Sequence, residues 1–144
     1  MKLFVNLFCH DIAAQLQFYR RLLDLPEASH SRSPIYCALE TPDFQFGFHA
    51  PAAYGLLGLG ELEPGPDARP SVTAYATFML ESPEAVQAAS ELATGLGGKR
   101  IKGPYATYYG EWQAVLADPE GHVFRLSTRG LPPGVDAPSL QLPS

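Results

Sequence analysis

The chain has 144 residues, 46% of them hydrophobic and 17% charged, and its formal net charge is -5 at pH 7. This length suits one compact domain, and the acidic balance argues against a nucleic-acid partner, whose footprint would be a basic patch. No apolar run approaches the ~20 residues of a membrane span, and the N-terminal sequence lacks the apolar core and cleavage site of a signal peptide. We therefore expect a cytoplasmic protein with no membrane segment.

Two cysteines, Cys9 and Cys37, lie in apolar runs typical of strands. Their spacing does not form a CxxC metal or redox motif. Small buried cysteines are common core residues, so we expect two buried thiols, with a disulfide as the alternative.

The first half of the chain predicts the element order β-α-β-β-β. The alternating run 2–9 is typical of a strand, and Asp11 is placed to cap a helix that Pro26 ends. Three further strands are expected at 27–32, 35–40 and 44–50.

The second half repeats this order after residues 51–71, a stretch dense in Gly and Pro that we interpret as a linker. Ser82 and Pro83 are typical of the first turn of a helix, which is expected to run to about Gly95. Strands are expected at 72–80, 99–103, 111–117 and 122–127.

A duplicated βαβββ unit indicates an α+β fold. One helix on a small sheet leaves the other face of that sheet poorly buried, and a second copy of the unit can cover it. We expect one domain over residues 1–129, with module one at 1–50, the linker at 51–71 and module two at 72–129. Residues 130–144 form a Pro-rich tail that we expect to be disordered or draped on the surface.

Two motifs carry a family resemblance over residues 2–128. The first helix contains "FYRRLLDL" and the last strand follows the turn in "DPEGHVFRLS". With the duplication, these resemble the vicinal oxygen chelate superfamily, which includes glyoxalase I, bleomycin-resistance proteins, fosfomycin-resistance enzymes and extradiol dioxygenases. The resemblance implies tandem modules that form a curved mixed eight-stranded sheet around an open cup, a small molecule inside the cup, and a homodimer.

The resemblance also implies where a metal would bind, because metal-dependent members take ligands from the first and fourth strands of each module. Those positions fall on Phe4, Gly47, Tyr75 and Arg125. None of them offers the imidazole or carboxylate that holds divalent metals in such sites, so we predict no metal and no other cofactor. His49, two residues after Gly47, is the one inward-facing candidate, and a second ligand for it is not identifiable.

A small-molecule site is expected on the inward strand positions and on a Tyr-rich connection that would form a lip. Aromatic rings there can stack on planar or cationic ligands, whereas the alternative is that the aromatics only fill the core. The predicted ligand-binding residues are Asn6, Phe8, His49, Tyr75, Tyr108, Trp112 and Arg125.

Arg125 stands in an otherwise apolar strand, on the face opposite Phe124 and Leu126. A buried guanidinium requires a partner, which would be a protein carboxylate, a carbonyl or a ligand anion. The alternative is that Arg125 is simply solvated.

Three functions remain open from the sequence. The leading hypothesis is small-molecule binding of the resistance or sequestration type, without metal and without catalysis. The alternative is a metal-dependent lyase, isomerase or dioxygenase that uses His49. A third is a regulatory subunit whose cup is filled by its own aromatic side chains.

Overall fold

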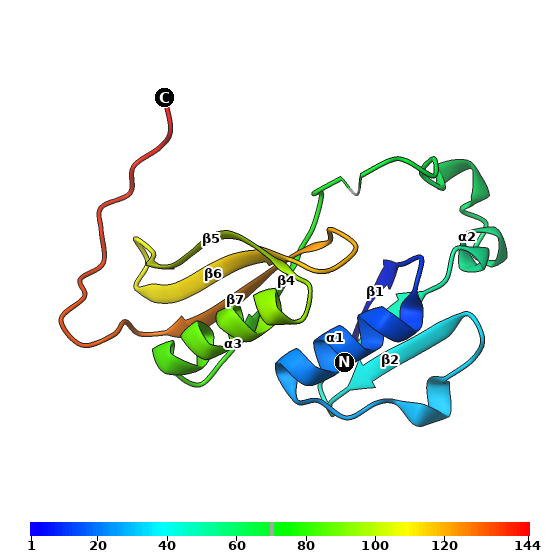
Figure 1. The fold of residues 1–144 in the computed structure, drawn as a ribbon, viewed down its shortest axis with the longest axis horizontal. Helices are drawn as coiled ribbons and strands as arrows, with labels where there is room; N and C mark the ends of the chain where they lie inside the picture. Colours follow the sequence, from blue (N-terminus) through cyan, green and yellow to red (C-terminus); the bar gives the residue numbers. More distant parts are fainter. Residues whose placement is uncertain (70) are drawn as a thin grey trace. The chain divides into compact units, whose positions relative to one another are not determined.

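The computed structural model describes residues 1–69 and 71–144, which form two units, Met1–Pro70 and Ser71–Ser144 (Figure 1). Residue 70, in the predicted linker, lies outside the described residues. The linker region also contains a short helix, α2 (Ala52–Leu56), and a 3-10 turn at Gly60–Leu62. Each unit has its own sheet and its own long helix.

The first unit contains a three-stranded sheet with the order β1-β3-β2, in which β1 is parallel and β2 antiparallel to β3. Its long helix follows β1 because the side chain of Asp11 accepts a hydrogen bond from the backbone N–H of Ala14, as predicted for a helix cap. The elements are β1 (Leu3–Phe8), α1 (Ile12–Leu23), β2 (Tyr36–Glu40) and β3 (Phe44–His49).

The strand predicted at 27–32 is not formed. Pro26 and Ala28 exchange backbone hydrogen bonds with Glu40 and Ala38 of β2, but Ser29–Ser31 then form a 3-10 turn. Pro26 has no N–H to donate, and the turn ends the pairing before a strand can develop. The described residues therefore form seven strands in sheets of three and four, and the prediction of one eight-stranded sheet is not confirmed.

The second unit has the predicted βαβββ order. Its four-stranded sheet has the order β4-β7-β6-β5, with β4 parallel to β7 and the other neighbours antiparallel. Ser82 caps the helix by accepting a hydrogen bond from the N–H of Ala85, and Pro83 begins it. The elements are β4 (Ala76–Met79), α3 (Pro83–Gly95), β5 (Lys99–Ala106), β6 (Glu111–Ala117) and β7 (Val123–Arg129).

Each helix covers one face of the sheet in its own unit (Figure 1). In the first unit, Tyr19 of α1 packs against Phe46 and Phe48 of β3. In the second, α3 buries Val86 and Ala93 against a sheet face that carries the buried Phe124 and Leu126. We call the opposite side of each sheet its far face. The residues on the far faces decide what the two sheets can bind.

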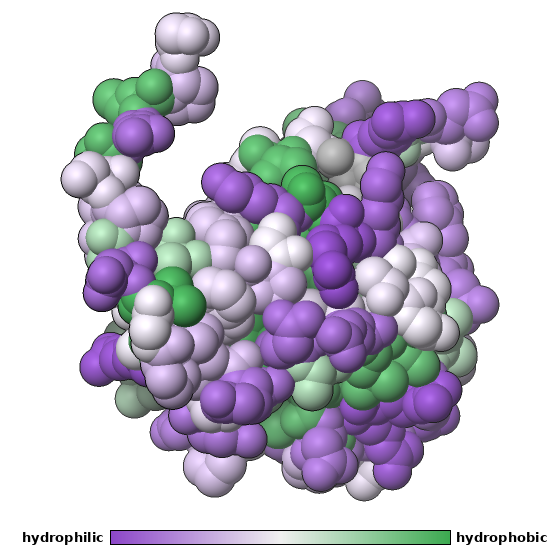
Figure 2. Space-filling view, turned by 60° about the vertical axis from the view of Figure 1, so that its left-hand side comes forward, coloured by the Kyte–Doolittle hydropathy of each residue, from purple (hydrophilic) through white to green (hydrophobic). Residues whose placement is uncertain are grey.

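Residues 131–144 contain no helix and no strand. Figure 2 shows apolar side chains on the protruding tail, and Leu140 and Leu142 are exposed there. Among the described residues, no helix is both long enough and apolar enough to cross a membrane.

Candidate functional site

The four positions at which the family resemblance predicts metal ligands lie at the far faces of the two sheets. In the first sheet, Phe4 pairs with Gln45 and Asn6 pairs with Gly47. In the second sheet, Thr77 pairs with Arg125, and the Arg125 guanidinium lies 5.1 Å from the centre of the Tyr75 ring. Paired residues of neighbouring strands share a face, so Phe4, Asn6 and Gly47 lie on one face of the first sheet, and Thr77 and Arg125 lie on one face of the second.

The far face of the first sheet is crossed by the side chain of Tyr36. A Cβ atom added to Gly47 would lie 2.2 Å from the Tyr36 hydroxyl oxygen and 2.5 Å from Asn6 Oδ1. The same hydroxyl lies 3.1 Å from Asn6 Oδ1 and 2.7 Å from Gln45 Oε1. Tyr36 therefore fills the space that any side chain at position 47 would need.

Tyr36 and Gln45 belong to a polar network that continues to the edge of the sheet. Gln45 is buried and donates from Nε2 to Glu40, which also accepts a hydrogen bond from Lys2. The hydrogen bond from Lys2 lowers the pKa of Glu40. Burial raises the pKa of Tyr36, which keeps its hydroxyl protonated. Tyr36, Gln45 and Glu40 therefore have hydrogen-bond partners within the protein.

His49 lies on the same far face but is outside this hydrogen-bond network. Its ring contacts Tyr36 at 4.7 Å between centroids and Phe8 at 5.6 Å, and Phe8 itself stacks on Tyr54 at 3.7 Å. The Nδ1 atom of His49 is buried and has no hydrogen-bond partner among the described residues. Burial lowers the pKa of His49, so the neutral imidazole is favoured. Of the predicted residues, Asn6, Phe8 and His49 lie together here.

Arg125 on the far face of the second sheet is held by neutral oxygen atoms. Its Nε donates to Thr77 Oγ1 at 3.0 Å, and its Nη1 donates to the Tyr109 hydroxyl at 3.2 Å. No carboxylate of the described residues lies within 4.0 Å of the guanidinium. The partners are therefore hydroxyl groups, a possibility that the sequence analysis did not consider.

The tyrosines of the predicted lip divide into two groups. Tyr109 donates to Gln113 Oε1 at 2.7 Å, and Gln113 Nε2 donates to the hydroxyl of Tyr105. Tyr108 is 55% exposed and contacts Tyr109 edge-to-face, with ring centroids 5.0 Å apart. Tyr109 therefore binds Arg125 directly and Tyr105 is connected to it through Gln113 and Tyr109, whereas Tyr108 is exposed at the surface.

Trp112 is not brought together with these residues. It pairs with Thr128, whereas Gln113 pairs with Ser127, so Trp112 faces α3 and not the far face. It lines an open groove of about 340 Å³ with residues of α3. The alternation of Trp112, Ala114 and Leu116 along β6 was the sequence signal for this orientation.

The residues at the four ligand positions do not fit a divalent metal ion. Phe4 and Gly47 offer no donor atom, Arg125 is a cation that only donates hydrogen bonds, and a phenol such as Tyr75 is outside the usual nitrogen, thiolate and carboxylate ligands. Building a ligand at position 47 would also require Tyr36 to move. Among the residues of β1, β2 and β3 that share this face with His49, Glu40 is the one with a carboxylate, imidazole or thiol group, and Lys2 and Gln45 already bind it.

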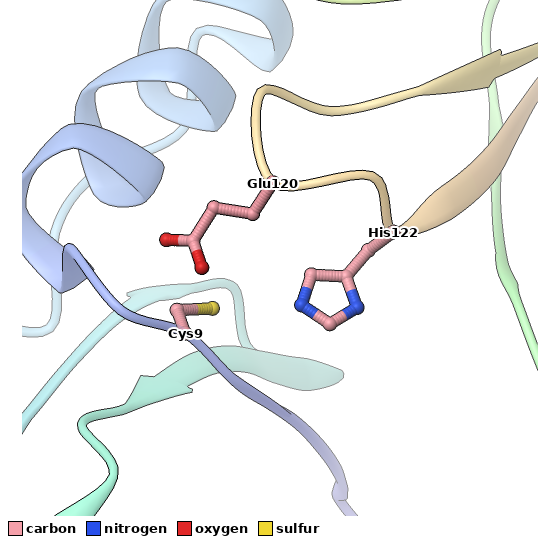
Figure 3. Close-up of side chains that lie close together, drawn as sticks. All are labelled: Cys9, Glu120 and His122. Carbon is pink, nitrogen blue, oxygen red and sulfur yellow. The ribbon is translucent and has the colours of Figure 1, made fainter. Parts of the chain in front are cut away.

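Three further side chains with possible metal-binding atoms are drawn in Figure 3: Cys9 of the first unit, and Glu120 and His122 of the second. Within the first unit, Cys9 Sγ lies 3.7 Å from Gln15 Nε2. Within the second unit, the backbone N–H groups of Glu120 and His122 donate to the Asp118 side chain. Among described residues within either unit taken alone, no three His, Cys, Asp or Glu side chains come close enough to hold a metal.

Sequence reasoning missed two residues that organise the far faces. Tyr36 of β2 contacts side chains of β1 and β3, and Gln113 of β6 joins Tyr105 of β5 to Tyr109 of the turn that follows β5. Alternation could have placed each of them on a face. Their partners depend on which strands are neighbours, which the sequence does not state.

Comparison with known proteins agrees with this architecture. Residues 2–127 match the family described as Glyoxalase-like domain. A glyoxalase/bleomycin resistance protein/dioxygenase family enzyme from Burkholderia phytofirmans PsJN is 36% identical, with a TM-score of 0.80, and the match covers 87% of this chain and 95% of that chain. No curated protein matches the chain.

More distant structures share the fold. A glyoxalase-related enzyme from Fulvimarina pelagi is 18% identical with a TM-score of 0.72, covering 90% of this chain and 88% of that chain. A glyoxalase/bleomycin resistance protein from Albidiferax ferrireducens T118 is 21% identical with a TM-score of 0.67, covering 88% and 97%. The family match over nearly the whole chain, together with the Burkholderia relative, shows that this chain belongs to the glyoxalase-like family of the vicinal oxygen chelate superfamily.

Proposed function

We propose that the protein binds a small organic molecule on the far face of its second sheet, without a resident metal ion and without transforming the ligand. The observation that carries this proposal is the set of residues around Arg125, whose guanidinium donates to the hydroxyl groups of Thr77 and Tyr109 and lies beside the Tyr75 ring. Such a set supplies rings for stacking and donors for hydrogen bonds, which small-molecule sites use. The setting we propose is a cytoplasmic homodimer of the resistance or sequestration type.

The test is elemental analysis of protein purified without chelators, together with a thermal-shift screen of planar organic compounds. We expect no stoichiometric zinc, nickel, manganese or iron, and a raised midpoint of thermal unfolding with some of the compounds, because a ligand that binds only the native state stabilises it. A chelator should leave both the midpoint and the binding unchanged. One equivalent of metal that is lost on chelation would overturn the proposal.

A metal-dependent lyase, isomerase or dioxygenase is the second candidate, and one observation favours it. The Nδ1 atom of His49 is buried and unpaired, and a buried acceptor without a partner is costly unless something binds it. This candidate predicts that His49→Ala removes bound metal. Elemental analysis of the purified protein detects metal bound anywhere in the chain. It therefore separates metal-free binding from a metal-dependent enzyme.

A further inference from the structure

The far face of the second sheet carries two cations that have only neutral partners. The Arg125 guanidinium donates to the hydroxyl groups of Thr77 and Tyr109, and the ammonium group of Lys102 lies 4.2 Å from the centre of the Tyr105 ring. Neither cation has a carboxylate of the described residues within 4.0 Å. Neither cation is therefore paired with an anion of the described residues, although the chain as a whole is acidic.

A chain of hydrogen bonds begins at Arg125 Nη1, and in it each group donates to the next one. Arginine has no acceptor, so its Nη1 must donate to the Tyr109 oxygen, and Tyr109 in turn donates to Gln113 Oε1. The amide nitrogen of Gln113 then donates to the Tyr105 oxygen. This leaves the O–H proton of Tyr105 at the end of the chain, and no described residue accepts it.

Both ends of this chain of hydrogen bonds carry donor groups that no described residue binds. Such donors favour a ligand whose polar group only accepts hydrogen bonds. Arg125 retains N–H groups that no described residue binds, and Tyr105 retains its O–H. Charge-assisted hydrogen bonds from guanidinium to an oxyanion are among the strongest in proteins, and exposed Tyr75 provides a ring beside the guanidinium for stacking.

We propose that the ligand is a planar organic anion, such as an aromatic carboxylate, whose charged group is bound by Arg125 and by the hydroxyl of Tyr105. This inference rests on the proposed small-molecule binding and narrows it, because a cationic ligand would meet Arg125 and Lys102. The carboxylate on the same face, Glu111, is engaged by Ser127 Oγ and is not within ion-pair distance of Arg125. Glu111 therefore forms no ion pair with the cations that the ligand would meet.

The experiment uses three flat aromatic probes of the same size that differ in charge: 2-naphthoate, neutral 2-naphthamide and cationic 2-naphthamidinium. Their binding to the full chain is measured by isothermal titration calorimetry. We expect 2-naphthoate to bind on the order of tenfold more tightly than the amide, and the cation to bind most weakly, because a charged hydrogen bond exceeds a neutral one by about this factor.

Two variants locate the binding site. Arg125→Gln should weaken 2-naphthoate binding by about tenfold or more while leaving the amide unaffected, because only the anion uses the guanidinium charge. Tyr105→Phe keeps the ring beneath Lys102 but removes the free donor, and should weaken 2-naphthoate by roughly fivefold. Arg100→Gln is the matched control, because Arg100 is exposed on β5 and pairs with Leu116, on the face toward α3. It should leave binding unchanged.

Thermal unfolding of each variant shows whether it is folded, and Tyr105→Phe keeps the test decisive if Arg125→Gln does not fold. Equal binding of the three probes, or 2-naphthoate binding that survives Arg125→Gln or Tyr105→Phe in folded protein, would overturn the inference. So would the absence of 2-naphthoate binding. These binding results do not test the proposed absence of metal. Stoichiometric metal in the purified protein would overturn the proposed function, whichever probe binds.

Discussion

Tyr36 lies across Gly47, with its hydroxyl oxygen 2.2 Å from the point that a Cβ atom at position 47 would occupy. Gly47→Ala must therefore displace the Tyr36 ring or the backbone, and overpacking of this kind costs about 1–3 kcal/mol of folding free energy. Urea unfolding measures this change. Gly55→Ala is the control, because nothing lies within 4 Å of its added methyl group. That variant, in α2, should be neutral or more stable by about 0.5–1 kcal/mol.

The pH dependence of stability should report the burial of His49. Burial lowers its pKa below the ordinary value of 6.5, so the unfolded chain binds more protons than the folded chain as the pH falls through that value. Stability is then lost as the pH falls from about 7.5 through 6.5 toward the lowered pKa of His49 in the folded protein. His49→Asn removes this contribution, so its free energy of unfolding should fall less than that of the wild type over the same range. Equal losses in the two proteins would contradict the prediction.

Arg125→Glu places a carboxylate at the position of a family metal ligand. We expect the variant to remain without stoichiometric zinc or nickel, because the other three positions hold Phe4, Gly47 and Tyr75, and one carboxylate does not make a site. Elemental analysis after dialysis against each metal measures the outcome. Uptake of one equivalent by the variant would reveal ligands that these positions do not include.

The orientation of the Gln113 side-chain amide, and not only its size, should affect ligand binding. Gln113→Glu replaces the amide donor by an acceptor, so the Tyr105 hydroxyl would donate to it and no longer to a ligand. The variant also adds a negative charge to the Arg125 network. We expect weaker binding of 2-naphthoate, measured by calorimetry. Gln17→Glu adds the same charge at an exposed position of α1 and should leave the affinity unchanged.

The two cysteines are free and buried, which confirms the sequence prediction. Burial raises the pKa of Cys37 to about 11, and the thiolate is the species that reacts with alkylating reagents. We expect Cys37 to resist iodoacetamide at about pH 8 in the native protein and to react once the chain is unfolded in urea. Mass spectrometry of the labelled peptides distinguishes it from Cys9. Rapid native labelling of Cys37 would show that this part of the first unit opens readily.

The family and most elements were predictable from the sequence because the signals for them are local. Asp11 and Ser82 cap their helices through atoms three residues away, and the period-two pattern of 111–117 gives β6 with its observed bounds. The strand expected at 27–32 was wrong because pairing with β2 ends at a 3-10 turn, and alternation over so few residues does not show where a neighbour is lost.

The sequence by itself determined which side chains the candidate site could use, including an arginine and a glycine where metal-dependent relatives have ligands. Only the tertiary structure decided how they are used. Tyr36 reaches across β3 to β1, and Arg125 finds Thr77 on β4 and Tyr109 beyond β5. These contacts join residues that are far apart in the chain, and they exist because particular strands are neighbours in a fixed register, which no local pattern of residues specifies.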